Sequence, residues 1–340
     1  MRMGCQTGRV LRSILTLGLL VCAGGAWVLA TGRLPTSRTL AETDGPAVEA
    51  ARLMERSLAS VRALRSEKGI PIDRAADPNA TGIIGDEFSP LTTSVGDVEA
   101  KRTAANPAFA AVMVGYFRRA GLRAGDVVAV GASGSFPAFA LATLSAAHAL
   151  DLRPVVVYSI GSSMFGANLP GFTLVDMLGR LRRDGLLPYG LTAVSPGGDD
   201  DGGRGVLFDE LGDTLMAETR RSGLPVVSGA TLADRIKDRL RIYEEATVRR
   251  PIRCFVNIGG SAASFGSTNA SLLLPNGLVL RPPVLPSSPT RGVVFEFAAR
   301  GVPVVHLLFV KGLARDNGLP FDPIPLPPIG EGAVYKSEGP

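Results

Sequence analysis

The sequence predicts an α/β protein with three layers and a mostly parallel sheet of about six strands, preceded by one N-terminal transmembrane helix. Two observations predict this fold class. From residue 126 onward, short β-branched apolar runs alternate with helix-length segments, as in parallel strands joined by helical crossovers. Before them, residues 13–31 carry no charge over a length that suits a membrane span.

The first segment, residues 1–32, is expected to be a cytoplasmic tip and a membrane anchor. A helix over residues 13–31 would be about 28 Å long, close to the ~30 Å hydrocarbon core of a bilayer. Arg2, Arg9 and Arg12 precede it, and positive flanks stay in the cytoplasm. We therefore predict a single-pass protein of the inner (cytoplasmic) membrane with an extracytoplasmic globular domain. A cleaved signal peptide is the alternative, and it places the domain on the same side.

Residues 33–71 are predicted to be a linker followed by an amphipathic helix over 46–68. Apolar residues recur there at steps of three and four from Val48 to Leu64, and Gly69 and Pro71 end the pattern. This apolar stripe either packs on the main domain or pairs with another chain. Residues 72–312 are expected to form the α/β domain, and residues 313–340 a Pro-rich C-terminal tail.

Within the α/β domain, residues 72–96 look irregular, and a helix is expected over 97–120 with a break at Pro107. Because the strands that follow are apolar on both faces, helices should cover both sides of the sheet, which makes the fold Rossmann-like. Strands are expected at 126–130, 154–158, 191–194, 225–227, 252–258 and 303–310, and helices at 136–150, 172–183, 208–221, 232–249 and 291–300.

Charge and composition argue against nucleic-acid binding. The net charge is +5, but Arg2, Arg9, Arg12 and Arg33 flank the first apolar stretch, and without these four the remainder is near +1. The rest of the chain has no block of Lys and Arg, and aromatic residues make up only 6% of the sequence. A nucleic-acid interface would need a basic face or stacking aromatics.

The sequence also offers little for metals or cofactors. Cys254 is the one cysteine of the globular part, and its apolar surroundings predict a core residue. No Cys/His spacing indicates zinc, and neither G-x-G-x-x-G after a strand nor a Walker A lysine is found. The acidic pair at 86–87 is interpreted as part of a plain loop before a helix, with a metal or acid/base role as the alternative. Residues 199–201 are interpreted as a solvated loop, with a divalent-cation site as the alternative. No metal and no cofactor is therefore expected.

Candidate ligand-binding residues gather in the loops that follow the predicted strands. In open parallel sheets, ligands lie beyond the carboxyl ends of the strands, and here those loops are rich in Gly, Ser and Asn. Glycine lets N–H groups approach a ligand, and a helix N-terminus attracts anions. Alternatively, the loops are tight turns with serine N-caps. The candidates are Gly131, Gly134, Ser162, Ser163, Asn168, Asn257, Gly259, Gly260 and Ser261.

A serine-dependent hydrolase or transferase is the alternative function, and the sequence leaves open whether the protein is an enzyme. The loop after the first strand resembles a nucleophile elbow but does not fit G-x-S-x-G. His148 and His306 fall inside a helix and a strand, so both are interpreted as core residues rather than triad members. Lys311 follows the last predicted strand. It either activates Ser133 or Ser135, binds an anion, or is a solvated lysine.

Three segments, together with the anchor, resemble the poly-gamma-glutamate system protein family over nearly the whole chain. They are IGDEFSPLTTSVGDVEAKRTAANP at 84–107, VVAVGASGSFPAF at 127–139 and FVNIGGSAASFG at 255–266. The resemblance implies a membrane-associated accessory role in poly-gamma-glutamate capsule synthesis and export. The implied partners are the synthase and export proteins, with the anionic polymer as a candidate ligand. No catalytic residue is carried over from the family.

Overall fold

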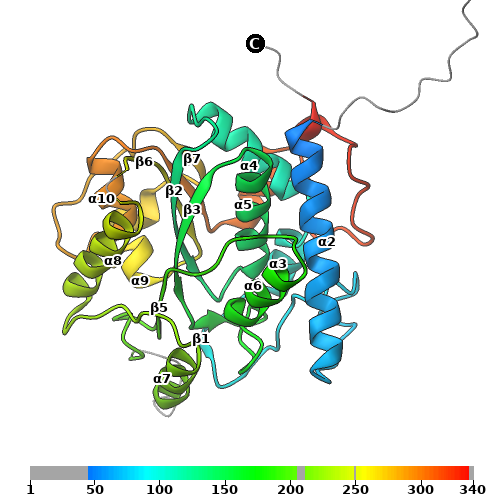
Figure 1. Ribbon diagram of the computed structural model, residues 1–340, viewed down its shortest axis with the longest axis horizontal. Helices are drawn as coiled ribbons and strands as arrows, with labels where there is room; N and C mark the ends of the chain where they lie inside the picture. The colour runs from blue at the N-terminus through cyan, green and yellow to red at the C-terminus, as the bar shows by residue number, and fades with distance from the viewer. Residues whose placement is uncertain (1–44, 205–210, 249, 337–340) are drawn as a thin grey trace, which may run out of the picture. The chain divides into compact units, whose positions relative to one another are not determined.

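Within the described residues, the central sheet has six strands in the order β5-β3-β2-β6-β8-β7. Figure 1 labels five of them, β5, β3, β2, β6 and β7. The computed structural model describes residues 45–204, 211–248 and 250–336. β7 (Gly277–Val279) runs antiparallel to its neighbour β8, and the other strands are parallel. The parallel strands are β2 (Val127–Ser133), β3 (Arg153–Ser159), β5 (Ala193–Ser195), β6 (Ile252–Ile258) and β8 (Val304–Leu307). The prediction of an α/β fold with a mostly parallel sheet of about six strands is confirmed.

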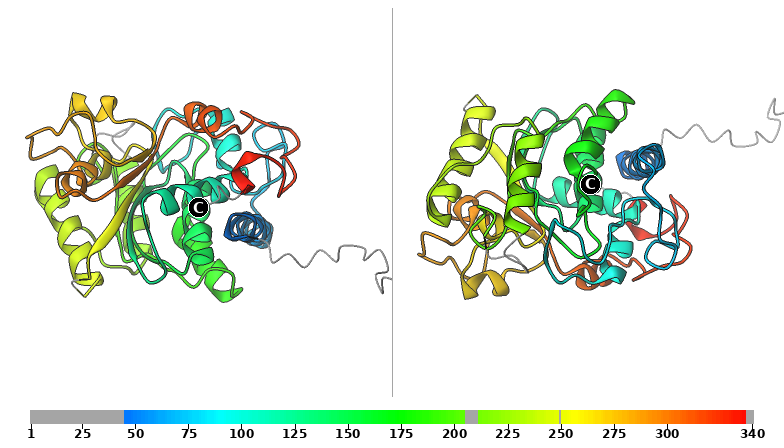
Figure 2. Two further views of the ribbon diagram at one scale, coloured as in Figure 1. Left: turned by 90° about the horizontal axis from the view of Figure 1, so that it is seen from above. Right: turned by 90° about the horizontal axis from the view of Figure 1, so that it is seen from below.

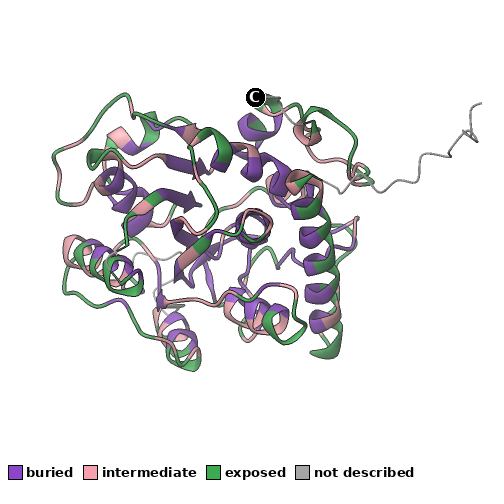
Figure 3. Cartoon of the chain, turned by 45° about the horizontal axis from the view of Figure 1, so that its top comes forward, coloured by how far each residue is buried: buried purple, intermediate pink, exposed green. Residues whose placement is uncertain are grey.

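Helices cover both faces of this sheet. Successive side chains along a strand point to opposite faces, and in these strands the side chains on both faces are apolar. Val128 and Val130 belong to one hydrophobic core, and Ala129 and Phe255 belong to a second. Figure 3 shows the buried residues concentrated on the strands and on the helix sides that face them. The first core contains α2 (Pro46–Glu67), α4 (Ala108–Arg119), α5 (Pro137–Ala149) and α6 (Leu174–Arg183), and the second contains α8 (Leu232–Ala246) and α10 (Val293–Ala299).

The amphipathic helix α2 packs on the domain through its apolar stripe. Pro46 occupies its first turn, where a missing N–H costs nothing. Leu53, Met54 and Leu58 are buried in the larger core, and the helix lies against α4 and α5. The structure thus answers the question that the sequence left open, since the stripe is covered within the chain.

The predicted transmembrane helix lies in residues 1–44, outside the residues that the structure describes. Within residues 45–204, 211–248 and 250–336, no helix is both long enough and apolar enough to cross a bilayer. The described residues group into one compact unit.

Several short elements differ from the sequence prediction. The break expected at Pro107 within 97–120 is confirmed, because this stretch forms two helices, α3 (Val98–Ala104) and α4, separated at residues 105–107. β1 (Thr92–Ser94) lies in the segment taken as irregular and pairs with β4 (Ser162–Ser163) in a small parallel sheet. The strand expected at 225–227 is reduced to one bridge between Val194 and Val226. α7 is described over Leu211–Arg221.

The C-terminal part also departs from the prediction. β8 ends at Leu307, three residues before the predicted end, and α11 (Val310–Asp316) begins at the residue where the strand was expected to end. This helix crosses the boundary expected between residues 312 and 313. The following segment returns to the domain. Asn79 Nδ2 donates to the Pro323 carbonyl at 2.9 Å. The short helix η2 (Ala333–Tyr335) contacts α2 and α4 (Figure 2). Two further short helices are α9 (Ala262–Phe265) and η1 (Asn269–Leu273).

Candidate functional site

A cleft lies at the carboxyl ends of the parallel strands, and we refer to it as the strand-end cleft. The sheet register places Ser133 opposite Ser159, and Ser159 opposite Ser195. The cleft has a volume of about 490 Å³, within the ~300–1,000 Å³ that is typical of small-molecule sites. The loops after β2, β3, β5 and β6 and the first turn of α11 all line it. Its hydroxyl-bearing lining residues are Thr93, Ser94, Ser133, Ser135, Ser159, Ser163 and Ser261.

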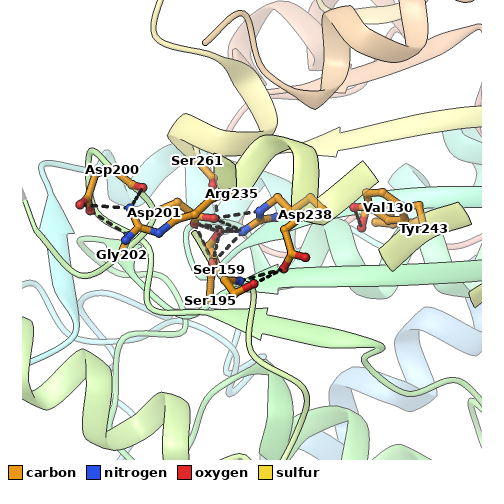
Figure 4. Close-up of polar contacts among 12 residues, drawn as sticks. Val130, Ser159, Ser195, Asp200, Asp201, Gly202, Arg235, Asp238, Tyr243 and Ser261 are labelled. Atoms are coloured by element: carbon orange, nitrogen blue, oxygen red, sulfur yellow. Dashed lines mark hydrogen bonds and ion pairs between the residues drawn. The ribbon is translucent and has the colours of Figure 1, made fainter. Parts of the chain in front are cut away.

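A buried ion pair between Arg239 and Asp201 holds the floor of the cleft. Figure 4 shows Asp201 close to Ser159, Ser195 and Ser261. Both side chains are fully buried, and Arg239 Nε donates to Asp201 Oδ2 at 2.8 Å. Ser159 and Ser195 donate to Asp201 Oδ1 at 3.0 and 2.6 Å, and Arg239 Nη2 donates to both hydroxyls. Ser261 Oγ lies 2.8 Å from Ser159 Oγ. Because the Ser159 hydrogen goes to Asp201, Ser261 is the donor here and keeps lone pairs for the cleft.

This network corrects the interpretation of residues 199–201 as a solvated loop. Asp201 is buried beneath the cleft, and Asp200 is paired with Arg204 and Arg235. Only Asp199 of the three lines the cleft. The acidic run therefore anchors α8 to the loop after β5.

Lys101, from α3, forms the opposite wall. It is 3% exposed, and its Nζ donates to the Ser135 carbonyl and, at 2.7 Å, to Ser163 Oγ. The same Nζ lies 3.8 Å from the centre of the Phe136 ring. Burial lowers the pKa of Lys101 to about 7, although the nearby Asp97 carboxylate favours the charged form. A lysine in this state exchanges a proton near neutral pH.

The remaining lining residues give the cleft mixed charge. Lys311 supplies a second ammonium group, and Asp97, Glu99 and Asp199 supply carboxylates. Asp97 is occupied as the N-cap of α3, because its carboxylate accepts the Glu99 N–H at 2.9 Å. Phe309, which is 56% exposed, adds apolar surface. The cleft thus suits a ligand that has both acidic groups and hydrogen-bond donors.

The structure brings part of the predicted site into the cleft. Within the described part of the chain, no hydrogen bond joins Lys311 to Ser133 or Ser135. Ser133 Oγ donates to a carbonyl of β6 at 3.3 Å instead. The lysine that contacts a serine is therefore Lys101 rather than Lys311. The predicted residues that line the cleft are Ser133, Ser135, Ser163, Gly260, Ser261 and Lys311.

Three predicted glycines serve the packing of the fold and do not line the cleft. A Cβ on Gly131 would lie 2.1 Å from Ser264 Oγ, so the sheet leaves no space for a side chain there. The Gly134 N–H donates to the Ser159 carbonyl at 3.0 Å, and the Gly259 N–H donates to a carbonyl of β8 at 2.9 Å. These amide hydrogens are used within the protein.

Three predicted polar residues also act internally. Asn168 Nδ2 donates to the Asp86 carbonyl at 2.7 Å and to Thr92 Oγ1 at 2.9 Å, which fixes the loop before β1. Asn257 Nδ2 donates to the carbonyl two residues on at 2.8 Å, and Ser162 Oγ donates to the next carbonyl at 2.8 Å. All three side chains are buried, so they shape the loops rather than face a ligand.

The two histidines differ in environment. His306 is 1% exposed and stacks on Phe265 with 5.0 Å between ring centres, and burial lowers its pKa to about 4. His148 was expected in the core but is exposed near the end of α5. Cys254 is buried as predicted, and burial raises the pKa of its thiol to about 12. Neither His306 nor Cys254 lines the cleft.

Sequence reasoning missed Lys101, Ser159 and Arg239. Ser159 follows a predicted strand directly, and that position could have identified it. Lys101 and Arg239 lie in helical segments, where a charged residue ordinarily faces solvent. Their burial depends on how α3 and α8 dock beside the strand ends.

Comparison of the chain with protein-family models, with curated proteins and with solved structures gave no match in any of the three. Across the described residues, no group of three or more His, Cys, Asp or Glu side chains is placed to hold a metal ion. The chemistry of the strand-end cleft therefore has to be argued from its own geometry.

Proposed function

We propose that the strand-end cleft binds a carboxylate-bearing ligand with amide groups, and that the protein is an accessory component of poly-gamma-glutamate synthesis or export. In this proposal the fold is Rossmann-like in its use of the strand ends for a ligand. Residues 13–31 would anchor the protein in the inner membrane, with the described domain outside the cytoplasm, beside the synthase and export proteins.

One observation carries the proposal, namely the convergence of hydroxyl and ammonium groups in one cleft. Lys311 is suited to pairing with a carboxylate, and the Ser261 hydroxyl keeps lone pairs for an amide N–H. Each unit of a gamma-linked glutamate chain has one free carboxylate and one amide. The exposed Phe309 ring would contact its methylene groups. The cleft volume suits a few such units.

The test is calorimetric titration of the full-length chain with a gamma-linked glutamate tetramer at low salt. We expect measurable binding that weakens as salt is raised, because part of the attraction is ionic. Lys311→Ala and Ser261→Ala should each weaken binding about tenfold, the loss of one hydrogen bond or ion pair. An alpha-linked glutamate tetramer of equal charge is titrated for comparison. Weaker binding of this tetramer shows that the cleft recognises the linkage, whereas equal binding shows ionic attraction alone.

Lys237→Ala is the matched control, because this lysine is exposed on α8 and does not line the cleft. It should bind the tetramer as the wild type does. Absence of binding at low salt would contradict the proposal. So would binding that Lys237→Ala reduces as much as Lys311→Ala does.

A further inference from the structure

Ser163 and Lys101 form a hydrogen-bonded pair that ligand binding alone does not require. The two side chains come from different elements, β4 and α3, and both line the strand-end cleft. Lys101 Nζ lies 2.7 Å from Ser163 Oγ, and the side chains are 3% and 6% exposed. A plain anion site would present its ammonium group to the ligand rather than bury it behind a hydroxyl.

The surroundings of Lys101 dictate where its lone pair points. A neutral amine has two hydrogens and one lone pair. The Ser135 carbonyl and the face of the Phe136 ring can only accept a hydrogen. Ser163 is the one partner of the three that can donate. When Lys101 is neutral, its lone pair therefore faces the Ser163 hydroxyl hydrogen.

We propose that Ser163 is a nucleophile and Lys101 its general base, so that the strand-end cleft catalyses acyl transfer from an amide or ester. The substrate class, a gamma-glutamyl amide, rests on the proposed function, whereas the nucleophile and base rest on the geometry alone. The sequence suggested that Lys311 activates Ser133 or Ser135. The pair of Ser163 and Lys101 takes the place of both suggestions.

The reaction balances with these two residues and water. Lys101 Nζ takes the Ser163 hydroxyl proton as Oγ forms a bond to the acyl carbon. The tetrahedral adduct collapses, the C–N bond breaks, and Lys101 returns the proton to the leaving amine. Lys101 then takes a proton from water as that water attacks the Ser163 ester. The carboxylic acid leaves, Oγ regains a proton, and an amine in place of water would give transfer.

The local structure holds the pair rigidly, as a nucleophile and base need. β4 is paired with β1, and the Ser163 N–H donates to Ser135 Oγ at 3.1 Å. Gly96 approaches so closely that a Cβ there would lie 3.1 Å from Ser163 Oγ. These contacts restrict the Ser163 side chain, so that its hydroxyl group stays next to the cleft.

The ionisation of Lys101 sets the expected pH dependence. Burial lowers its pKa to about 7 and Asp97 opposes this shift, while the other charged groups lining the cleft are Glu99, Lys311 and Asp199. Below that pKa the ammonium form has no lone pair and cannot accept a proton. Nucleophilic reactivity of Ser163 should therefore be low in acid and rise through about pH 7.

The experiment is labelling of the full-length chain with an alkyl fluorophosphonate, with peptide mapping of the adduct. We expect one adduct, on Ser163, with a rate that rises through an apparent pKa near 7. Ser163→Ala should abolish it, and Lys101→Met and Lys101→Arg should slow it about 100-fold or more, the usual contribution of a general base. Thermal unfolding checks that each variant folds. Ser66→Ala, an exposed serine on α2, is the matched control and should label normally.

An adduct on another serine, no adduct at all, or unchanged labelling in folded Lys101→Arg would each overturn the proposal. Calorimetry of Ser163→Ala with the gamma-linked tetramer distinguishes a wrong assignment of the nucleophile from a wrong assignment of the ligand class. Retained tetramer binding without labelling leaves a binding protein with no nucleophile. Labelling of Ser163 without tetramer binding keeps the nucleophile and excludes the ligand class.

Discussion

Gly131 lies in β2 between two parallel neighbours, at a position where the sheet has room only for hydrogen. A Cβ there would lie 2.1 Å from Ser264 Oγ and 3.0 Å from Phe255 Cζ. Both neighbours are buried, so neither moves without disturbing the second core. The glycine that the sequence suggested for ligand contact is thus needed for packing behind the cleft.

We predict that Gly131→Ala lowers the free energy of unfolding by about 1–3 kcal/mol, as overpacking in a core does. Chemical denaturation measures it. Gly115→Ala is the matched control, because this glycine lies in α4 with nothing within 4 Å of the added Cβ, and it should raise stability by about 1 kcal/mol. Adding Ser264→Ala to Gly131→Ala should restore part of the lost free energy of unfolding, because it removes the Oγ that the new Cβ would contact. Equal effects of the two glycine substitutions would contradict this packing account.

At the scale of elements, α8 is attached to the loop after β5 by one side chain, that of Arg239. Arg239 is fully buried and reaches Asp201 and the serines of the cleft floor, whereas Arg241 on the same helix makes exposed ion pairs with Asp238 and Glu245. Removing one partner of a buried ion pair leaves an uncompensated charge, but exposed pairs contribute little.

We therefore predict that Arg239→Leu lowers the free energy of unfolding by about 3–5 kcal/mol, and that Arg241→Leu lowers it by less than about 1 kcal/mol. Urea denaturation of both variants gives the comparison. A loss of stability for Arg239→Leu no larger than that for Arg241→Leu would show that the buried pair does not hold the floor. Failure of Arg239→Leu alone to fold would agree with the prediction.

The long elements were predictable from the sequence, and the short ones were not. β2, β3 and β6 were recognised because several consecutive apolar residues identify a doubly covered strand. β1, β4 and β7 have two or three residues each, and only their pairing partners define them. α11 was taken as the end of a strand because Val310 is apolar in either structure.

The candidate site was predictable in location but not in its working residues. Parallel strands end at one edge, so the loops after β2, β3, β5 and β6 were expected to meet, and they do. Which groups face the cleft depends on three-dimensional contacts. Asn168 and Asn257 turned inward to loop carbonyls, whereas Lys101 entered from a helix that precedes the sheet.

At the scale of the whole described unit, the cleft joins segments from distant parts of the chain. Thr93 before α3 and Phe321 after α11 line the same cavity as the strand-end loops. Arg102, next to Lys101, pairs with Asp322 near the C-terminal end of the described chain. Arg102 Nε donates to Asp322 Oδ1 at 2.6 Å. A ligand in the cleft would therefore restrain both ends of the unit together with its sheet.

The central claim is that a carboxylate-bearing ligand occupies the strand-end cleft. Hydrogen–deuterium exchange of the full-length chain, with and without the gamma-linked glutamate tetramer, tests it most directly. Bound ligand should slow exchange in residues 93–101, 133–136, 159–164 and 259–262, and Lys311→Ala should diminish the effect. Protection confined to other segments, or none at a concentration that saturates binding, would contradict the claim.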